Sequence, residues 1–359
     1  MNSAIIIPAL NPKTELLDLL KGLLALGAPQ IIVVNDGSGQ EYDDIFEKVS
    51  VLPKCVLLKH AVNMGKGRAL KTAFAYYLDN CSHLDGVVTA DADGQHSVED
   101  ISRIAYALNN NRDKLVLGVR NFEKDKVPRR SYMGNTITSL CFKLFYGYYL
   151  KDTQTGLRGI PTSELGWMLE LSGERYDFEI NMLIKARRRK LDFLEIGIDT
   201  IYFDNNAGSH YGSFKDSARI FCKLIGGLIH YSLSCSFSAL VDVMAFIILN
   251  SFVLSSMPLA SRLLLATIIA RTISSLFNFF INSQIVFVND KRILASAVKY
   301  YSLWLMQMIS SYALVYAGSM YLGLGDSVCK IIVDIGLALI SYQVQMNWVF
   351  SGKKGLAGI

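Results

Sequence analysis

Four long apolar segments in the second half of the chain constrain its fold more than any other feature of the sequence. Residues 222–359 hold only 13 of the Lys, Arg, Asp and Glu residues, whereas residues 1–221 hold 54. Each segment is long enough to cross the ~30 Å hydrocarbon core of a bilayer as a helix. The sequence therefore predicts a water-soluble N-terminal domain and an all-α transmembrane domain with four spans, at Leu233–Leu254, Leu263–Ile285, Val298–Leu322 and Ser327–Phe350.

The basic residues between these segments predict how the chain is oriented. Lys291 and Arg292 lie between the second and third segments, and Lys353 and Lys354 follow the fourth. Because basic loops stay in the cytoplasm, we expect both termini there, with the bacterial inner membrane as the host. Six scattered cysteines, without a close pair, also favour a reducing compartment for the N-terminal domain.

An amphipathic segment separates the two regions. Ile220, Leu224 and Leu228 recur at four-residue spacing while basic residues line another face, as in a helix that lies in the membrane interface. A second apolar stretch, residues 132–149, fits either an interfacial helix or an ordinary core helix. The predicted organisation is a cytoplasmic domain over residues 1–212, an interfacial helix over 213–232 and a transmembrane domain over 233–359.

The membrane segments contain two further patterns. The second ends in "FNFFINSQIVF" and the fourth in "SYQVQMNWVF", which predicts a two-fold internal repeat unless the likeness is chance. Asp242 and Arg271 lie near the middle of the first two segments, where an uncompensated charge costs about 2.5–3.5 kcal/mol. We expect them to pair, or to line a polar path together. The alternative is that serines satisfy Asp242 and that Arg271 reaches toward the membrane surface.

The N-terminal region alternates short apolar runs with helical patterns, which predicts an α/β fold with a mostly parallel sheet. Three polar motifs, "PALN", "NDGS" and "DADGQH", each follow a predicted strand directly. Because ligands bind beyond the carboxyl ends of such strands, the three motifs should converge on one crevice. The predicted strands are Ile5–Ile7, Ile31–Val34, Val56–Leu58, Gly86–Thr89 and Leu115–Gly118.

The motif "DADGQH" predicts a metal site. Asp91 and Asp93 are two residues apart, so an extended backbone presents both carboxylates on one side. Together with the Gln95 amide they form a hard oxygen-ligand set that suits Mg²⁺ or Mn²⁺ and leaves positions for substrate phosphates. A solvated turn is the usual alternative for an isolated Asp-x-Asp.

Other motifs narrow the class of substrate. "NMGKGRALKTAF" places Lys66 at a helix start, where cations and N–H groups favour phosphate. The spacing is not that of a Walker A loop, and no G-x-G-x-x-G follows the first strand, which argues against an ATPase and a dehydrogenase. A net charge of +5 without a dense basic-aromatic stripe argues against nucleic acid.

Taken in order, "IIIPALN", "VVNDGSG", "NMGKGRALKTAF", "TADADGQH" and "DTQTGLRG" resemble glycosyltransferase family 2. More narrowly, they resemble its polyprenyl-phosphate sugar synthases of the dolichol-phosphate mannose synthase type, over roughly residues 4–220. The four apolar segments are similar to the GtrA-like membrane domain. The resemblance implies a Rossmann-like GT-A fold, a Mg²⁺ or Mn²⁺ cofactor, and transfer of one sugar from a UDP- or GDP-linked donor to a polyprenyl phosphate, with inversion.

The resemblance also implies roles for individual residues. Asn11 stands where many relatives carry glutamate. Gly212 stands where arginine or asparagine is common, so His210 and Lys215 are the cations expected to bind the acceptor phosphate. We expect catalytic roles for Asp93, Asp152 and Arg130, and metal binding by Asp91, Asp93 and Gln95. The expected donor-binding residues are Pro8, Leu10, Asn11, Asp36, Lys66, Asp91, Gln95 and Arg120. The expected acceptor-phosphate residues are Thr155, Gly156, Arg158, His210 and Lys215, and the sugar pocket is assigned to Asp177 and Glu179.

Two alternatives stay open beside a lipid-phosphate glycosyltransferase. A processive polysaccharide synthase would ordinarily carry Gln-x-x-Arg-Trp after the metal site, and no such string occurs. A flippase-type membrane protein with a regulatory GT-A domain is disfavoured by the intact Asp91-x-Asp93 and "DTQTG". The expected partners are a nucleotide sugar, a polyprenyl phosphate and the lipid bilayer, and a homo-oligomer is left open.

Overall fold

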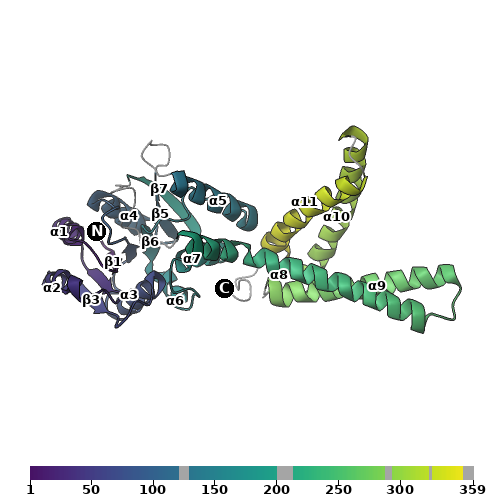
Figure 1. Ribbon diagram of the computed structural model, residues 1–359, viewed down its shortest axis with the longest axis horizontal. Coiled ribbons are helices and arrows are strands. Elements are labelled where there is room, and N and C mark those ends of the chain that lie inside the picture. Colours follow the sequence, from purple (N-terminus) through teal and green to yellow (C-terminus); the bar gives the residue numbers. More distant parts are fainter. Residues whose placement is uncertain (121–128, 200–212, 288–292, 323–325, 351–359) are drawn as a thin grey trace. The chain divides into compact units, whose positions relative to one another are not determined.

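The computed structural model describes residues 1–120, 129–199, 213–287, 293–322 and 326–350 (Figure 1). The chain divides into two compact units, one built mainly from residues up to 224 and the other mainly from residues after 224. Each unit is described by itself.

The first unit is built on a mostly parallel sheet, as predicted. Among the described residues the sheet has seven strands in the order β3-β2-β1-β4-β6-β5-β7. Only β6 is antiparallel to its neighbours, β4 and β5. The strands are β1 (Ala4–Ala9), β2 (Ile31–Asn35), β3 (Cys55–Lys59), β4 (Gly86–Thr89), β5 (Lys114–Arg120), β6 (Arg158–Pro161) and β7 (Asp192–Ile198).

Helices cover both faces of this sheet, which explains why its central strands are continuous apolar runs. Ile5 and Ile7 share a core with α1 (Glu15–Ala25), α2 (Asp43–Ser50) and α4 (Val98–Asn110). Ile6 is equally buried but points to the other face, where α3 packs against β1 and β2. The remaining helices of this unit are η1 (Gln40–Tyr42), α3 (Lys66–Asn80), α5 (Arg129–Tyr146), α6 (Thr162–Leu169) and α7 (Asp177–Arg188).

The second unit is helical. Two helical stretches of the described chain, Phe221–Val253 and Leu259–Val286, are long and apolar enough to cross a membrane. The third and fourth predicted segments are also helical, and their crossing of the membrane stays a prediction. The elements are α8 (Ser213–Ile248), η3 (Leu249–Val253), α9 (Leu259–Ile281), η4 (Asn282–Val286), α10 (Ile293–Leu322), α11 (Asp326–Val344) and η5 (Gln345–Val349).

The segment expected to be an interfacial helix, residues 213–232, is continuous with the first span. The interfacial segment and the first span up to Ile248 belong to the 36-residue helix α8, and the span continues into the π-helical turn η3. Because the helix has no break at the predicted boundary, the change from amphipathic to apolar sequence is not a change of secondary structure. The interfacial position of its first turns stays a prediction.

The predicted internal repeat is present in the contacts of the second unit. The Tyr300 hydroxyl donates to Asn278 at 2.7 Å, and the Tyr231 hydroxyl donates to Ser341 at 3.1 Å, each bond joining one helical hairpin to the other. Within the hairpins, Asn278 donates to Ser238 at 2.9 Å and Ser341 donates to Gln307 at 3.2 Å. Equivalent positions of α8–α9 and α10–α11 therefore make equivalent bonds.

The centre of this repeat is a pair of buried amides. Asn282 and Gln345 begin the π-helical turns η4 and η5, and Asn282 Nδ2 donates to Gln345 Oε1 at 3.1 Å. One turn further on, Phe287 and Phe350 stack with ring centroids 5.3 Å apart. Polar groups inside a membrane domain need partners in protein, and here each hairpin supplies those of the other.

Asp242 and Arg271 lie within ion-pair distance, which confirms the pairing predicted for them. Arg271 Nε is 3.5 Å from Asp242 Oδ2, and the Ser274 hydroxyl donates to the other carboxylate oxygen at 3.1 Å. The Arg271 side chain is 72% exposed whereas that of Asp242 is 20% exposed. The aspartate is therefore held by Ser274 as well as by the arginine.

Candidate active site

The loops that follow β1 and β2 meet at the carboxyl edge of the sheet, as the strand-end motifs predicted. Pro8 lies in β1 opposite Val34, and Leu10 and Asn11 follow that strand. The Asn11 N–H donates to Ser38 Oγ at 2.9 Å, and the Gly39 N–H donates to Asn11 Oδ1 at 3.2 Å. Asn11 adopts a positive φ of 49°, which its short polar side chain tolerates.

Asp36 fastens the next two loops together. Its carboxylate is 3% exposed and accepts the N–H groups of Met64 at 3.0 Å and Gly65 at 2.8 Å. His60 Nδ1 lies 2.7 Å from the same carboxylate, and its other ring nitrogen lies 2.9 Å from Thr72 Oγ1. With its oxygens engaged in this way, Asp36 fixes the approach to α3.

The start of α3 is packed against the turn that precedes α7. The Arg68 N–H donates to the carbonyl of Glu174 at 3.1 Å, and Arg68 and Lys71 both form ion pairs with the Glu174 side chain. Gly65 has a φ of 99°, and a Cβ at this position would collide with the Glu174 carbonyl. Only glycine fits there, and the close approach brings Glu179 of α7 beside Lys66 of α3.

Lys66 bridges two acidic residues at the centre of the site. Its Nζ is 2.6 Å from Asp91 Oδ1 and 2.9 Å from Glu179 Oε1. Burial alone would lower the pKa of Lys66, but the two carboxylates outweigh it and hold that pKa above its ordinary value. Asp91 is affected in the opposite sense, since Lys66 and His96 lower its pKa despite the cost of burial. The donor-diphosphate side and the sugar pocket predicted from sequence thus share one cation.

Asp93 completes an acidic cluster that suits a divalent cation. Burial first, and then the neighbouring charge of Asp91, raise the pKa of Asp93, although its carboxylate accepts the Gln95 N–H at 3.1 Å. The carboxylates of Asp91 and Glu179 both contact Lys66, the charge of Asp93 adds to theirs, and the buried Arg158 guanidinium is a second positive charge that interacts with Asp91 and Glu179. Within the described ranges no three His, Cys, Asp or Glu side chains are arranged to hold a metal by themselves. Metal binding by Asp91, Asp93 and Gln95 stays a prediction, and their oxygen atoms are of the kind that Mg²⁺ and Mn²⁺ prefer.

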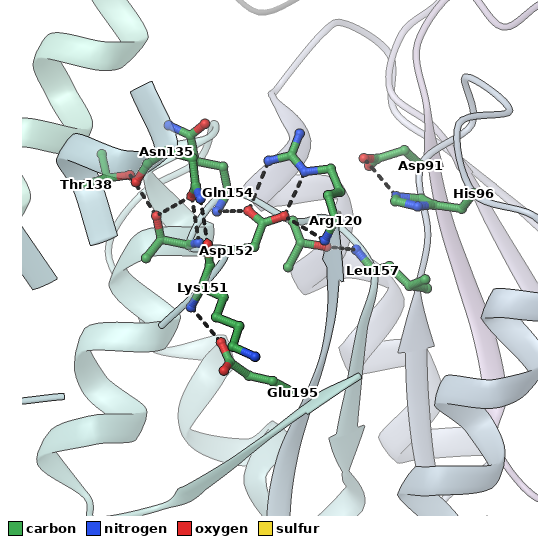
Figure 2. A network of polar contacts seen from close by, with 12 residues as sticks. Asp91, His96, Arg120, Asn135, Thr138, Lys151, Asp152, Gln154, Leu157 and Glu195 are labelled. Atoms are coloured by element: carbon green, nitrogen blue, oxygen red, sulfur yellow. Dashed lines mark hydrogen bonds and ion pairs between the residues drawn. The ribbon is translucent and has the colours of Figure 1, made fainter. Parts of the chain in front are cut away.

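Asp152 is fully buried and bound on all sides (Figure 2). Arg120 donates to both of its oxygens, from Nε at 2.7 Å and from Nη2 at 2.9 Å, and the N–H of Gln154 donates at 3.0 Å. Carboxylate and guanidinium match in the two-pronged geometry that only arginine provides. The arrangement supports a positioning role for Asp152, which fixes Arg120 at the end of β5 against the loop 151–157.

Polar side chains of α5 hold the same loop from the other side. Asn135 donates to the Lys151 carbonyl at 2.6 Å and accepts the Thr153 N–H at 3.0 Å. The hydroxyls of Thr138 and Thr153 lie 2.8 Å apart, and the Lys151 N–H donates to Glu195 of β7 at 2.7 Å (Figure 2). Burial raises the pKa of Glu195, and this N–H opposes the rise.

The predicted acceptor residues Thr155, Gly156 and Arg158 lie in the interior. Thr89 Oγ1 donates to the Gly156 carbonyl at 2.7 Å, and a Cβ on Gly156 would collide with the Asp91 carboxylate. Arg158 is 1% exposed, and its guanidinium donates to the carbonyls of Thr155 at 2.9 Å and Glu179 at 2.7 Å. It joins the loop to α7, while its Nη2 atom has no hydrogen-bond partner among the described residues.

Helix α5 buries several polar side chains and exposes several apolar ones. Asn135, Thr138 and Ser139 are buried, as are the aromatic side chains of Phe142, Phe145 and Tyr146. The apolar side chains of Met133, Ile137, Leu140 and Leu144 are between 40% and 61% exposed. This confirms neither simple alternative for residues 132–149, because the helix packs polar and aromatic side chains and exposes apolar ones.

Several predicted residues cannot be placed at the site. His210 lies outside the described residues, and the side chains of Arg130 in α5 and Lys215 in α8 lie outside the described part as well. Asp177 starts α7 and accepts the Arg175 N–H at 3.2 Å, so its described contact belongs to the turn before the helix.

Sequence reasoning also missed residues that the structure brings to the site. His96, whose Nε2 lies 3.6 Å from Asp91 Oδ2, stands inside the quoted metal motif, and His60 directly follows β3. Both were detectable because they follow parallel strands. Asn135, Glu174 and Glu195 had no such signal, since helix packing and an edge strand bring them in.

The fold and the site define a class: an α/β enzyme with an acidic, lysine-bridged centre at the carboxyl edge of its sheet, joined to membrane-type helices. Residues 4–164 match the family described as glycosyl transferase family 2, and residues 230–350 match the GtrA/DPMS transmembrane domain. The chain belongs to glycosyl transferase family 2, and it is a membrane glycosyltransferase with a GT-A domain.

Named relatives extend this comparison. A UDP-N-acetylglucosamine–dolichyl-phosphate N-acetylglucosaminyltransferase of Methanococcus voltae is 32% identical, over 55% of this chain and 85% of that protein. A dolichyl-phosphate β-glucosyltransferase of Trichomonas vaginalis is 30% identical, over 47% of this chain and 54% of that protein. A crystal structure of glucosyl-3-phosphoglycerate synthase from Mycobacterium tuberculosis, with Mn²⁺ and UDP, is 16% identical with a TM-score of 0.49, over 63% of this chain and 79% of that one.

Proposed function

We propose that this protein transfers one sugar from a nucleotide diphosphate sugar to a polyprenyl phosphate at the cytoplasmic face of a bacterial inner membrane, which it crosses four times. The product is a lipid-linked sugar that serves as a donor for modification of cell-envelope glycans. The names of the Methanococcus and Trichomonas relatives support a dolichyl-type phosphate acceptor.

The observation that carries this proposal is the two-faced helix α5. Its buried polar side chains hold the loop 151–157 through Asn135 and Thr138, and that loop in turn holds Arg120 and abuts Asp91. Its other face exposes a row of apolar side chains at helical spacing, which suits contact with lipid. The element that shapes the site is therefore also the element suited to meet a lipid acceptor.

The chemistry needs alignment more than a strong base. The second pKa of a phosphate monoester is about 6, so the acceptor is largely a dianion at neutral pH. One of its oxygens attacks the anomeric carbon, the bond from that carbon to the donor diphosphate breaks, and the nucleoside diphosphate departs with the electron pair. Inversion follows from attack opposite to the leaving group. Asp152, already saturated with donors, positions Arg120 and does not need to remove a proton.

Donor binding is assigned to residues at the carboxyl edge of the sheet. Asn11 and Asp36 shape the nucleotide side, Lys66 faces the diphosphate, and Glu179 faces the sugar. A Mg²⁺ or Mn²⁺ ion held by Asp91, Asp93 and Gln95 would neutralise the leaving diphosphate. Arg130, His210 and Lys215 are proposed to contact the phosphates on the acceptor side.

The test is a transfer assay with purified full-length protein in detergent. UDP- and GDP-linked sugars are each supplied with undecaprenyl phosphate or dolichyl phosphate, and the expected product is a lipid-soluble glycoside that mild acid cleaves. A matched reaction offers a soluble oligosaccharide as acceptor. Elongation of the oligosaccharide would support a polysaccharide synthase instead, and donor turnover that never depends on the lipid phosphate would overturn the proposal.

A further inference from the structure

The ammonium group of Lys66 lies directly against the carboxylate of Asp91. Its Nζ lies 2.6 Å from Asp91 Oδ1, a shorter separation than that to Glu179. The side chain is only 17% exposed and its ammonium group lies 5.8 Å from the centre of the Tyr176 ring. Such a short, sheltered contact is a charge-assisted hydrogen bond, stronger than a surface ion pair.

The backbone around Lys66 sets this contact. Gly65 takes up the positive φ that starts α3, and Asp36 holds its N–H at 2.8 Å. On the other side the carbonyl of Glu174 accepts the Arg68 N–H at 3.1 Å. Since the backbone is held at Gly65 before Lys66 and at Arg68 two residues after it, the ammonium group leaves Asp91 by rotation about its own side-chain bonds.

The same carboxylate is the proposed metal ligand, so one anionic oxygen has two competing cations. Asp91 Oδ2 faces His96 at 3.6 Å and also adjoins Gly156. A divalent ion that approaches Asp91 therefore has to displace the ammonium group from Oδ1 or share the carboxylate with it. Repulsion between the two cations opposes sharing.

We infer that Lys66 is a built-in counter-ion of Asp91, which makes metal binding depend on the nucleotide donor. Without nucleotide, Lys66 neutralises Asp91 and the divalent cation binds weakly. When a nucleoside diphosphate enters, its phosphate oxygens offer Lys66 another anionic partner, and Asp91 becomes available to the metal ion. The inference rests on the proposed function, because it takes Asp91 as the ligand of a cation that accompanies a nucleotide donor.

Glu179 extends this coupling to the sugar pocket. Lys66 joins Asp91 to Glu179 in the absence of donor, so its movement toward the diphosphate also releases the Glu179 carboxylate. Metal binding, diphosphate binding and the exposure of the sugar-binding carboxylate are then one event. By linkage, the nucleotide must tighten the metal ion by the same factor that the metal ion tightens the nucleotide.

The test measures binding of Mn²⁺ to full-length protein by the electron paramagnetic resonance signal of the unbound ion, without nucleotide and with UDP or GDP. In the wild type, we expect nucleotide to tighten the binding of Mn²⁺ to the protein by roughly 5- to 150-fold. This factor is calculated after subtraction of the Mn²⁺ that the free nucleotide binds. Lys66→Gln should tighten binding without nucleotide and shrink the nucleotide effect. Lys66→Arg keeps the charge and should restore part of the wild-type pattern.

A matched control is Lys71→Gln on the same helix. Lys71 is also buried and paired, but with Glu174 at 3.0 Å, so its loss removes one charge without touching Asp91. Equal Mn²⁺ affinity of the wild type and Lys66→Gln without nucleotide would overturn the inference. So would the same gain in Lys66→Gln and Lys71→Gln, which would mean a general charge effect. A thermal melt followed by the fluorescence of Trp167, with Trp304 and Trp348 replaced by Phe, identifies any variant that is not folded. If Lys66→Gln is not folded, Lys66→Met replaces it.

The binding readout is independent of transfer. If Mn²⁺ binding behaves as expected but no sugar reaches a polyprenyl phosphate, the proposed function fails and the role of Lys66 stands. If transfer occurs and Lys66→Gln leaves metal binding unchanged, the role of Lys66 fails and the proposed function stands.

Discussion

Removing the Arg120 side chain should destabilise the catalytic unit severely, because it strands a buried charge. Asp152 is 0% exposed, and Arg120 supplies two short side-chain hydrogen bonds to its carboxylate. In Arg120→Met the carboxylate keeps, among the residues that the structure describes, the backbone donors of residue 120 and Gln154. Breaking a buried pair by removing one partner costs about 3–5 kcal/mol. For a unit of this size that corresponds to a fall in Tm on the order of 10 °C.

A double variant tests whether the unpaired charge of Asp152 causes the loss of stability. Asp152→Asn keeps the shape of the side chain and leaves Arg120, which is 15% exposed, able to reach water. Arg120→Met combined with Asp152→Asn should therefore be more stable than the sum of the single losses, by about 0.5–3 kcal/mol. Strictly additive losses would refute the reasoning.

The assay needs a signal from the catalytic unit alone. Trp167 in α6 is the only tryptophan in residues 1–221, and its Nε1 donates to Glu164 at 2.7 Å. With Trp304 and Trp348 replaced by Phe, tryptophan fluorescence during heating follows this unit in the full chain. The control is Lys59→Met, because Lys59 and Asp43 form an exposed pair at 3.6 Å whose loss should cost at most about 1 kcal/mol.

Four other expectations can be checked on the same protein. Asp91→Asn and Asp93→Asn should each abolish sugar transfer while the thermal unfolding followed by Trp167 stays cooperative. EDTA should abolish transfer by the wild type, and full activity in metal-free buffer would contradict a metal requirement. Ile137→Glu on the exposed face of α5 should weaken use of long-chain polyprenyl phosphate at least about tenfold, the effect of some 1.4 kcal/mol of lost lipid contact, while nucleotide binding measured by calorimetry stays unchanged; loss of both would indicate misfolding. Burial raises the pKa of Glu195, so the folded chain holds that proton more tightly than the unfolded chain does. The resulting contribution to stability is full below the ordinary pKa of 4.5 and is lost as pH rises through the raised pKa. Glu195→Gln should flatten that part of the Tm-against-pH curve, and a curve identical to that of the wild type would disprove the assignment. Asp242→Ala and Arg271→Ala should couple in a double-mutant cycle of detergent unfolding by about 0.6 kcal/mol and at most about 1.7 kcal/mol, whereas zero coupling would mean that Ser274 alone satisfies Asp242.

Periodicity and strand-end chemistry were enough to predict the core of the catalytic fold. The runs that became β1, β2 and β4 are apolar over most of their length because helices cover both faces of the sheet, and such runs are detectable in a single sequence. Their parallel arrangement then placed Asn11, Asp36 and Asp91 at one edge. These predictions needed no knowledge of contacts across the chain.

The elements that were not predicted depend on such contacts. Strand β6 is four residues long and begins with Arg158, a residue type that a sequence pattern treats as exposed. Arg158 is nevertheless buried, and its guanidinium donates to the carbonyls of Thr155 and Glu179. The saturation of Asp36 and Asp152 was equally hidden, because Asp36 binds N–H groups of the loop before α3 and Asp152 binds Arg120 of β5, all distant in sequence. A motif identifies which residue type stands at a site, but only the fold shows whether its oxygens are already occupied.

The paired hairpins of the second unit have a consequence for how the protein is made. Asn278 finds the Tyr300 hydroxyl 22 residues later in the chain, and Asn282 finds Gln345 only after 63 residues. At about 5–20 residues per second, the ribosome needs roughly 3–13 s to synthesise those 63 residues. During that interval the first hairpin stands in the bilayer with side-chain amides that lack their final partners. In a chain truncated before α11, Asn282 would never meet Gln345, so the first hairpin completes its polar contacts only when the second hairpin has been made.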